Sequence, residues 1–152
     1  MAANPELWDA LLPVVDVLEA LDITYCIGGS VASSFAGVAR ATLDVDLVAD
    51  LHPEHAAPLA DALTRDYCLN VDMIREAISR RRTFNVIHLA TMFKIDVFVM
   101  EATAFAQANM ARRVAFEVPD LGRTFYFTSP KDIVLHKLLW YVMGGEVLDL
   151  QR

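Results

Sequence analysis

The alternation of apolar and polar residues predicts an ordered succession of helices and strands. Apolar residues at helical spacing predict an amphipathic helix from about Pro5 to Leu21. The run ITYCIGG (23–29) is typical of a strand that ends at two glycines, and a short helix of small residues is expected from Ser30 to about Gly37. The segment LDVDLVAD (43–50) then predicts a second strand, in which polar and apolar residues alternate.

The rest of the chain continues this mixed pattern. Ser129 and Pro130 predict the start of the last helix, with Ser129 as its N-cap and Asp132 in its first turn. The order favours an α+β fold, with a small mixed sheet flanked by helices, in one domain spanning residues 1–152. The expected elements are helices over 52–67, 70–82, 102–110 and 130–145, strands over 84–90 and 93–100, and a second hairpin over 112–129.

Composition restricts the class of protein. The chain has 152 residues, of which 55% are hydrophobic and 22% charged, as in a globular domain. The longest apolar runs are far shorter than the roughly 20 residues that span a bilayer, and the N-terminus lacks the basic region of a secretion signal. We therefore expect a cytoplasmic protein without membrane contact. Cys26 and Cys68 show neither metal-binding nor disulfide spacing, so both are expected to be buried thiols.

The net charge of −7 argues against a broad electrostatic interaction with nucleic acid, which needs many cationic contacts to phosphate. It does not exclude a local site, because divalent cations can neutralise carboxylates there. The run SRRRT (79–83) is a compact basic patch, and its simplest interpretation is a solvated helix end favoured by the helix dipole.

Three aspartates suggest chemistry on a strand. Asp44 and Asp46 are two residues apart, so on a strand they share one face, about 7 Å from each other. Like charges at this separation repel unless a cation lies between them, and carboxylate oxygens suit Mg²⁺. Asp96 has the same alternation in FKIDVFVM, and convergence of the three would give a two-metal site for phosphoryl or nucleotidyl transfer. The alternative is a solvent-facing sheet surface on which the acids have a structural role only.

The glycines before these acids suggest an anion site. Gly28 and Gly29 end a strand and Ser30 begins a helix, so backbone amides at the helix start could hold a phosphate. The pattern is neither GxGxxG nor GxxxxGK[ST], which excludes the Rossmann and P-loop motifs at the residue level. A phosphate-binding site at these glycines, next to carboxylates that bind metal ions at the adjacent strand end, would fit a nucleoside triphosphate with Mg²⁺.

With these residues, the sequence resembles the nucleotidyltransferase superfamily that includes DNA polymerase beta. The signature of that family is Gly-Ser, a short helix, Asp-x-Asp and a later third acid, and the matching positions here are Gly29, Ser30, Asp44, Asp46 and Asp96. The stretch GGSVASSFAGVARATLDVDLV looks most like the branch of AbiEii-type toxin-antitoxin enzymes and minimal nucleotidyltransferases. The late segment SPKDIVLHKLLWYVMGGEVLDLQR is also similar, with Lys137 at the position of a lysine near the triphosphate.

The resemblance implies a nucleotidyltransferase fold and roles for particular residues. Amides at 28–30 would hold the triphosphate of an NTP, and Asp44, Asp46 and Asp96 would ligate two Mg²⁺ ions, or Mn²⁺. Asp96 would also lower the pKa of the attacking hydroxyl, directly or through the metal. Arg40 and Lys137 are candidates to balance phosphate charge, although Arg40 could pair with a nearby carboxylate and Lys137 could be a surface lysine.

The implied reaction is transfer of a nucleoside monophosphate to a hydroxyl of RNA such as tRNA, of a partner protein or of a small molecule. A toxin-antitoxin role is implied as well. The alternative is an inactive module of such a pair that binds nucleotide or partner. Related chains continue with a further helix rich in Arg and Asp, so an acceptor-binding part beyond Arg152 is expected to be missing here or supplied by another chain.

Overall fold

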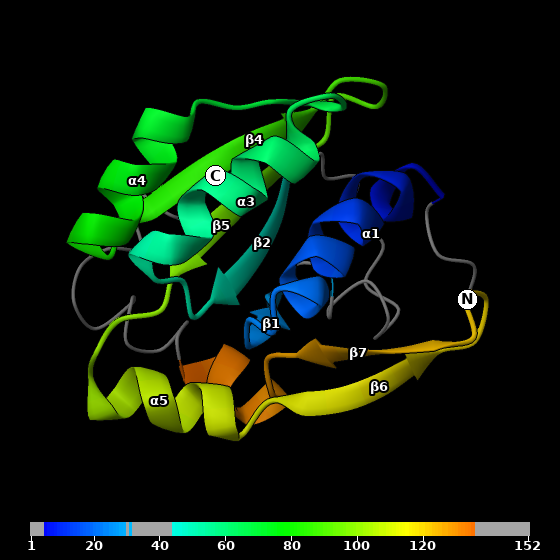
Figure 1. Ribbon diagram of the computed structural model, residues 1–152. Coiled ribbons are helices and arrows are strands. Elements are labelled where there is room, and N and C mark those ends of the chain that lie inside the picture. Colours follow the sequence, from blue (N-terminus) through cyan, green and yellow to red (C-terminus); the bar gives the residue numbers. More distant parts are fainter. Residues whose placement is uncertain (1–4, 30, 32–43, 136–152) are drawn as a thin grey trace, which may run out of the picture.

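The structure is a computed structural model that describes residues 5–29, 31 and 44–135. Its centre is a seven-stranded mixed sheet with the strand order β3-β4-β5-β2-β1-β7-β6 (Figure 1). The strands are β1 (Tyr25–Ile27), β2 (Asp44–Ala49), β3 (Tyr67–Cys68), β4 (Thr83–His88), β5 (Lys94–Val99), β6 (Val114–Val118) and β7 (Arg123–Phe127). The helices are α1 (Pro5–Ala20), the 3-10 turn η1 (Pro53–His55), α3 (Ala56–Leu63), α4 (Val71–Arg80) and α5 (Ala104–Ala111), and residues 130–135 are helical as well.

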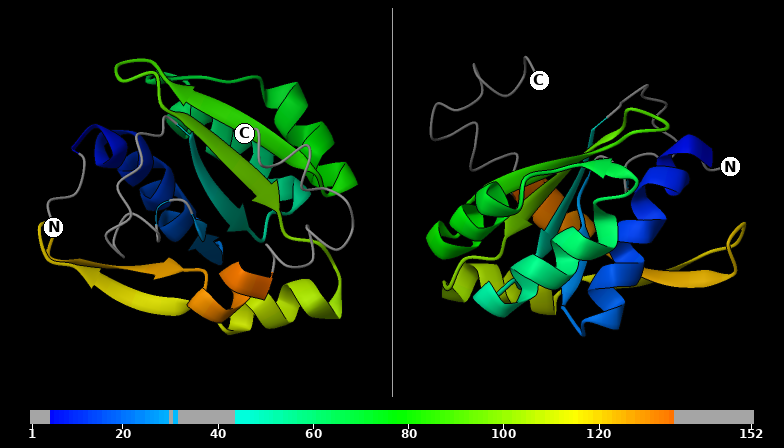
Figure 2. Two further views of the ribbon diagram at one scale, coloured as in Figure 1. Left: turned by 180° about the vertical axis from the view of Figure 1, so that it is seen from behind. Right: turned by 45° about the horizontal axis from the view of Figure 1, so that its top comes forward.

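Three helices cover one face of the sheet. Figure 1 shows α1, α3 and α4 in front of the strands, and the view from behind in Figure 2 shows β2, β4 and β5 nearest the viewer. Because side chains alternate along a strand, β2 and β5 turn every second residue toward these helices. The core consists of these residues and the apolar stripe of α1, and its fully buried members include Leu11, Val14, Val15, Val45, Leu47, Ile95 and Val97.

Most predicted elements are confirmed, including the first helix, the strands on either side of Thr91 and the hairpin around residues 120–122. α4 begins where Asn70 accepts hydrogen bonds from the amides of Asp72 and Met73, and it ends at Arg81, whose φ of 50° is left-handed. The helix predicted over residues 70–82 is thus confirmed, and local chemistry at Asn70 and Arg81 defines its two ends.

The predicted helix over residues 52–67 is wrong at its C-terminal end. The helix ends at Leu63, and Tyr67 begins the short edge strand β3, where it pairs with His88 of β4. Burial of the Tyr67 ring, whose hydroxyl donates to the carbonyl of Ala10 in α1, favours this extended conformation over another helical turn. Periodicity alone does not reveal such a long-range contact.

The environment of Cys68 also differs from the expectation. Cys26 is buried, but Cys68 is exposed on β3 at the edge of the sheet. Its neighbour Tyr67 points to the core, so alternation along the strand turns the Cys68 thiol outward.

Among the helices within residues 5–29, 31 and 44–135, none combines the length and the apolar character that crossing a membrane requires.

Candidate active site

The three aspartates lie on two adjacent strands and on one face of the sheet. β2 and β5 are parallel, with Asp46 directly opposite Asp96 and Asp44 opposite Lys94. Residues that alternate with these acids, such as Val45 and Ile95, are buried under the helices, so the carboxylates point to the opposite face. Parallel pairing in this register is what brings residues 50 positions apart in the chain into one row.

Gly28 lies beside Asp46 on the next strand. Its N–H donates to the carbonyl of Asp46 at 2.7 Å, which extends the antiparallel ladder of β1 and β2. A Cβ at Gly28 would lie 1.8 Å from Oδ2 of Asp46, so only glycine leaves room for the carboxylate in this orientation. The Gly28 amide is already hydrogen-bonded within the sheet, and its missing Cβ leaves space for the Asp46 carboxylate. Its role in nucleotide binding stays a prediction.

Gly29 marks the transition from the strand to helical backbone. A Cβ there would lie 3.3 Å from Cγ1 of Ile133, which belongs to the helical residues after β7. β7 runs parallel to β1, with Phe127 opposite Ile27, so this second helix starts at the same end of the sheet. Ser30, Arg40 and Lys137, the other predicted nucleotide contacts, lie outside the described residues.

The local electrostatics distinguish Asp96 from an ordinary surface acid. Burial raises the pKa of the Asp96 carboxyl, and the nearby Asp44 and Asp46 raise it further, while Lys94 acts in the opposite direction. Nζ of Lys94 lies 3.7 Å from Oδ1 of Asp96. A carboxylate in this environment holds a proton more readily than a free aspartate does, which suits a group that accepts a proton.

Within the described residues, no three carboxylate, imidazole or thiol groups lie close enough together to hold a metal ion. The Asp46 carboxylate lies over Gly28, and Oδ1 of Asp96 lies 3.7 Å from Nζ of Lys94. The donor set still fits Mg²⁺, because Asp46 and Asp96 lie on the same face at paired positions of adjacent strands and supply carboxylate oxygens.

Two further residues lie near the aspartates: Asn85, which was not singled out from the sequence, and Cys26, which was expected only to be a buried thiol. Asn85 of β4 lies opposite Asp96, so Gly28, Asp46, Asp96 and Asn85 form one row across four strands. The alternation in FNVIH, which turns Asn85 outward between two buried residues, is the signal that could have revealed it.

Cys26 is the other neighbour, on β1, with its Sγ 3.5 Å from Oγ1 of Thr128. Burial raises the pKa of the Cys26 thiol, and the nearby Asp46 and Asp132 act in the same direction, against the opposing effects of Thr128 and Arg113. A thiol with a raised pKa stays protonated at neutral pH and is a poor nucleophile. Cys26 is therefore a packing residue beside the site.

A buried polar network fixes the helix after β7. Ser129 caps it, with its Oγ accepting from the Asp132 amide at 3.1 Å and donating to the Asp132 carboxylate at 2.8 Å. Arg112, which follows α5, donates to the same carboxylate from Nε and Nη2, the latter at 2.7 Å. Asp132 is 1% exposed, so these bonds satisfy a buried charge and hold the helix that packs against Gly29.

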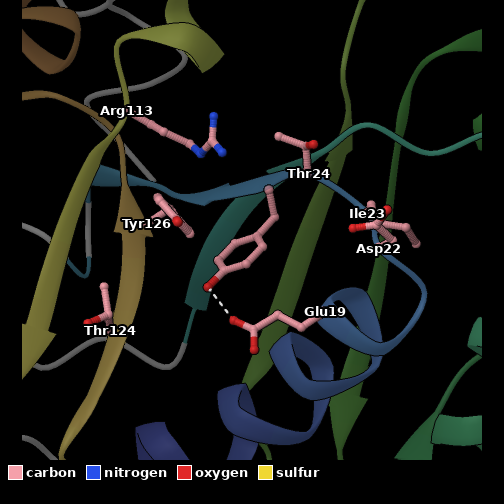
Figure 3. Close-up of a pocket in the computed structure, with 8 residues that line it drawn as sticks. Glu19, Asp22, Ile23, Thr24, Arg113, Thr124 and Tyr126 are labelled. Carbon is pink, nitrogen blue, oxygen red and sulfur yellow. Dashed lines mark hydrogen bonds between the residues drawn. The ribbon is translucent and has the colours of Figure 1, made fainter.

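A pocket of about 380 Å³ lies at the other end of β1 (Figure 3). The Tyr25 hydroxyl donates to Glu19 at 3.1 Å, and the guanidinium of Arg113 lies 4.5 Å from the centre of the Tyr126 ring. The pocket is thus separate from the aspartate row, which begins beyond the opposite end of this strand. Its lining comprises Glu19, Asp22, Ile23, Thr24, Tyr25, Arg113, Thr124 and Tyr126.

Comparisons with known proteins identify the fold. No protein-family profile matches the chain, and no curated protein matches it significantly. Among solved structures, a candidate nucleotidyltransferase from Thermotoga maritima is similar, with a TM-score of 0.63 and 14% identity over 97% of this chain and 92% of that one. The lincosamide antibiotic adenylyltransferase LnuA, in its lincomycin-bound form, has a TM-score of 0.54 and 15% identity over 88% of this chain and 85% of its own. The chain thus has a nucleotidyltransferase-like fold, as the resemblance of its sequence implied.

Proposed function

We propose that the protein is an Mg²⁺-dependent nucleotidyltransferase that transfers a nucleoside monophosphate from an NTP to a hydroxyl group. The observation that carries this proposal is the strand register, which sets Asp46 directly opposite Asp96 with Asp44 on the same face. A fold shared with a candidate nucleotidyltransferase and an adenylyltransferase supports it.

Two features speak for a binding site rather than an incidental group of acids. The Asp46 carboxylate occupies space that only a glycine at position 28 leaves open. The end of β1, the start of the helix at Gly29 and the start of the helix after Ser129 meet at the same end of the sheet. Helix starts favour anions, so a triphosphate is attracted to the place where the carboxylates could hold its cation.

In this proposal Asp44, Asp46 and Asp96 would hold Mg²⁺, which when bound neutralises triphosphate oxygens and makes a hydroxyl easier to deprotonate. Asp96 accepts the proton of the attacking hydroxyl. A bond forms between the acceptor oxygen and the α-phosphorus, and the bond from that phosphorus to the bridging oxygen breaks, so pyrophosphate leaves. Arg40 and Lys137 are the candidates to neutralise the negative charge of the leaving pyrophosphate.

The acceptor is proposed only as a class: a hydroxyl of RNA, of a protein or of a small molecule. LnuA modifies a lincosamide, which makes a small hydroxyl-bearing compound one reasonable candidate. The resemblance of residues 28–48 to AbiEii-type enzymes supports RNA or a partner protein and a toxin-antitoxin role instead. The carboxylate row is common to all three and does not discriminate among them.

The test is incubation with each of the four α-labelled NTPs and Mg²⁺ against total RNA, lysate protein and lincomycin, with pyrophosphate release measured in parallel. We expect label in one acceptor fraction. Asp46→Asn and Asp96→Asn should each lower the rate about 100-fold or more, the scale of losing a catalytic carboxylate. The exposed Asp72→Asn on α4 is the matched control and should retain the wild-type rate.

Full activity in both Asp46→Asn and Asp96→Asn would exclude the proposed chemistry. NTP binding by calorimetry without label transfer to any acceptor would instead favour the inactive binding module.

A further inference from the structure

β6 forms one edge of the sheet and extends in a hairpin with β7 at one end of the molecule (Figure 1). Within the described residues, β6 pairs only with β7, and no described strand lies on its other side. The first four residues of β6 are exposed, and only Val118 is buried. An exposed edge of this length readily accepts a further strand unless charges or bulges protect it.

The side chains of β6 favour pairing of this edge with another strand and do not block it. Val114 and Phe116 share one face and are 43% and 44% exposed, and the Phe116 ring also contacts Phe127 of β7. Arg113, Ala115 and Glu117 alternate with them on the other face. The edge thus presents apolar side chains on one face and the exposed Glu117 on the other, where the half-buried Arg113 lies over the Tyr126 ring and donates from Nη1 to the Met110 carbonyl at 2.9 Å.

This sequence is complementary to itself in an antiparallel pairing. If Ala115 pairs with Ala115 of a second copy, Arg113 lies opposite Glu117 of that copy, and Val114 lies opposite its Phe116. The two-fold symmetry repeats each pair, giving two opposite-charge pairs and two apolar pairs. Both kinds of cross-strand pair are stabilising, whereas like charges opposite each other are not.

We propose that two copies of the chain form a symmetric dimer through antiparallel pairing of β6 with β6, centred on Ala115. The two sheets then become one continuous sheet. Because the symmetry axis is perpendicular to the sheet, the Asp44–Asp46–Asp96 faces of both copies lie on the same side. This arrangement does not depend on the proposed transferase activity.

Two variants test the dimer and its register. Glu117→Arg replaces both opposite-charge pairs with like-charge pairs and should weaken dimerisation about tenfold in sedimentation equilibrium over a dilution series.

Ala115→Cys places two thiols on the axis, where cross-strand Cα atoms about 4.5–5.5 Å apart permit a disulfide. It is made with Cys68→Ser, because Cys68 is exposed. Thr124→Cys in the same background lies one strand inward and is the matched control.

We expect a wild-type dimer, a weaker Glu117→Arg dimer, and oxidative linkage of Ala115→Cys but not of Thr124→Cys. A wild-type chain that sediments as a monomer at every concentration overturns the proposal. So does a dimer that forms equally well in Glu117→Arg, or one in which Ala115→Cys links no faster than Thr124→Cys.

Discussion

Gly28 and Asp46 show how one absent methyl group determines where a carboxylate can lie. The backbone of Gly28 is an ordinary part of the ladder with β2, through its hydrogen bond to the Asp46 carbonyl. Its importance lies in the missing Cβ, whose place Oδ2 of Asp46 occupies. A glycine that looked like a phosphate contact in the sequence therefore acts through the neighbouring acid.

Gly28→Ala should lower transferase activity about tenfold or more with little loss of stability, because the Asp46 side chain must rotate away from the new methyl group. Labelled-nucleotide transfer and urea unfolding measure the two effects. Gly122→Ala is the control: its φ of 60° makes alanine strained, yet nothing lies within 4 Å. That variant should lose about 1 kcal/mol of stability and no activity. Wild-type activity in Gly28→Ala would contradict this role.

Asp96 carries a pH dependence whose sign follows from its surroundings. Burial, Asp44 and Asp46 raise its pKa in the folded state, so the ionised carboxylate is less favourable there than in the unfolded chain. The resulting penalty is absent below the ordinary aspartate pKa of about 3.9, where both states are protonated, and complete above the raised pKa.

Asp96→Asn in chelator should therefore melt a few degrees higher than the wild type at neutral pH, and this gain should disappear as the pH falls below about 4. Melting curves across the pH range check this. Glu76→Gln, on the exposed face of α4, should change the melting temperature little at any pH. A gain that persisted at acid pH would mean that packing, rather than ionisation, limits stability at this position.

At the scale of elements, the N-caps Asn70 and Ser129 each begin a helix, but only the helix of Ser129 adjoins the candidate site. Asn70 caps α4 on the helical side of the sheet, whereas Ser129 caps the helix that packs against Gly29. Both caps follow from sequence-local chemistry. Only Ser129 also donates to a buried carboxylate, that of Asp132, and so links its helix to Arg112.

Asn70→Ala should cost about 1 kcal/mol of stability, and Ser129→Ala up to about 2 kcal/mol, because the second also removes a donor from a buried acid. Urea unfolding gives both values. Only Ser129→Ala should reduce nucleotide transfer, since its helix adjoins the aspartate row. Equal activity in the two variants would show that the position of this helix does not matter for the reaction.

At the scale of the whole molecule, the hydrophobic core and the candidate active-site residues lie on opposite faces of the sheet. One face packs against α1, α3 and α4 around the core (Figure 2), and the other carries the row from Gly28 to Asn85. The core therefore does not depend on the acids, and variants of Asp44, Asp46 and Asp96 should fold. Their mutual repulsion is relieved either by neutral substitution or by a bound cation.

Mg²⁺ should accordingly raise the melting temperature of the wild-type chain by several degrees. A cation at 100 times its dissociation constant stabilises a protein by about 2.7 kcal/mol. Asp46→Asn should abolish the shift, and Asp72→Asn on exposed α4 should retain it. Differential scanning calorimetry with and without chelator makes the measurement. A wild-type chain indifferent to Mg²⁺ would favour a purely structural role for the acids.

The sequence by itself determined what depends on neighbours along the chain. Alternation located β2 and β5, the capping residue Ser129 located the start of the last helix, and the two-residue spacing put Asp44 and Asp46 on one face. Each of these signals is local, because strand and helix periods act over a few residues.

Only the tertiary structure decided which strands are neighbours, in which direction and in which register. A slip of one residue between β2 and β5 would turn Asp96 to the core face, and nothing local in either strand fixes their pairing. The same holds for β3, which exists because Tyr67 reaches α1, and for Gly28, whose function depends on a side chain from another strand. Long-range pairing is set by the packing of the whole core, so it cannot be read from one segment.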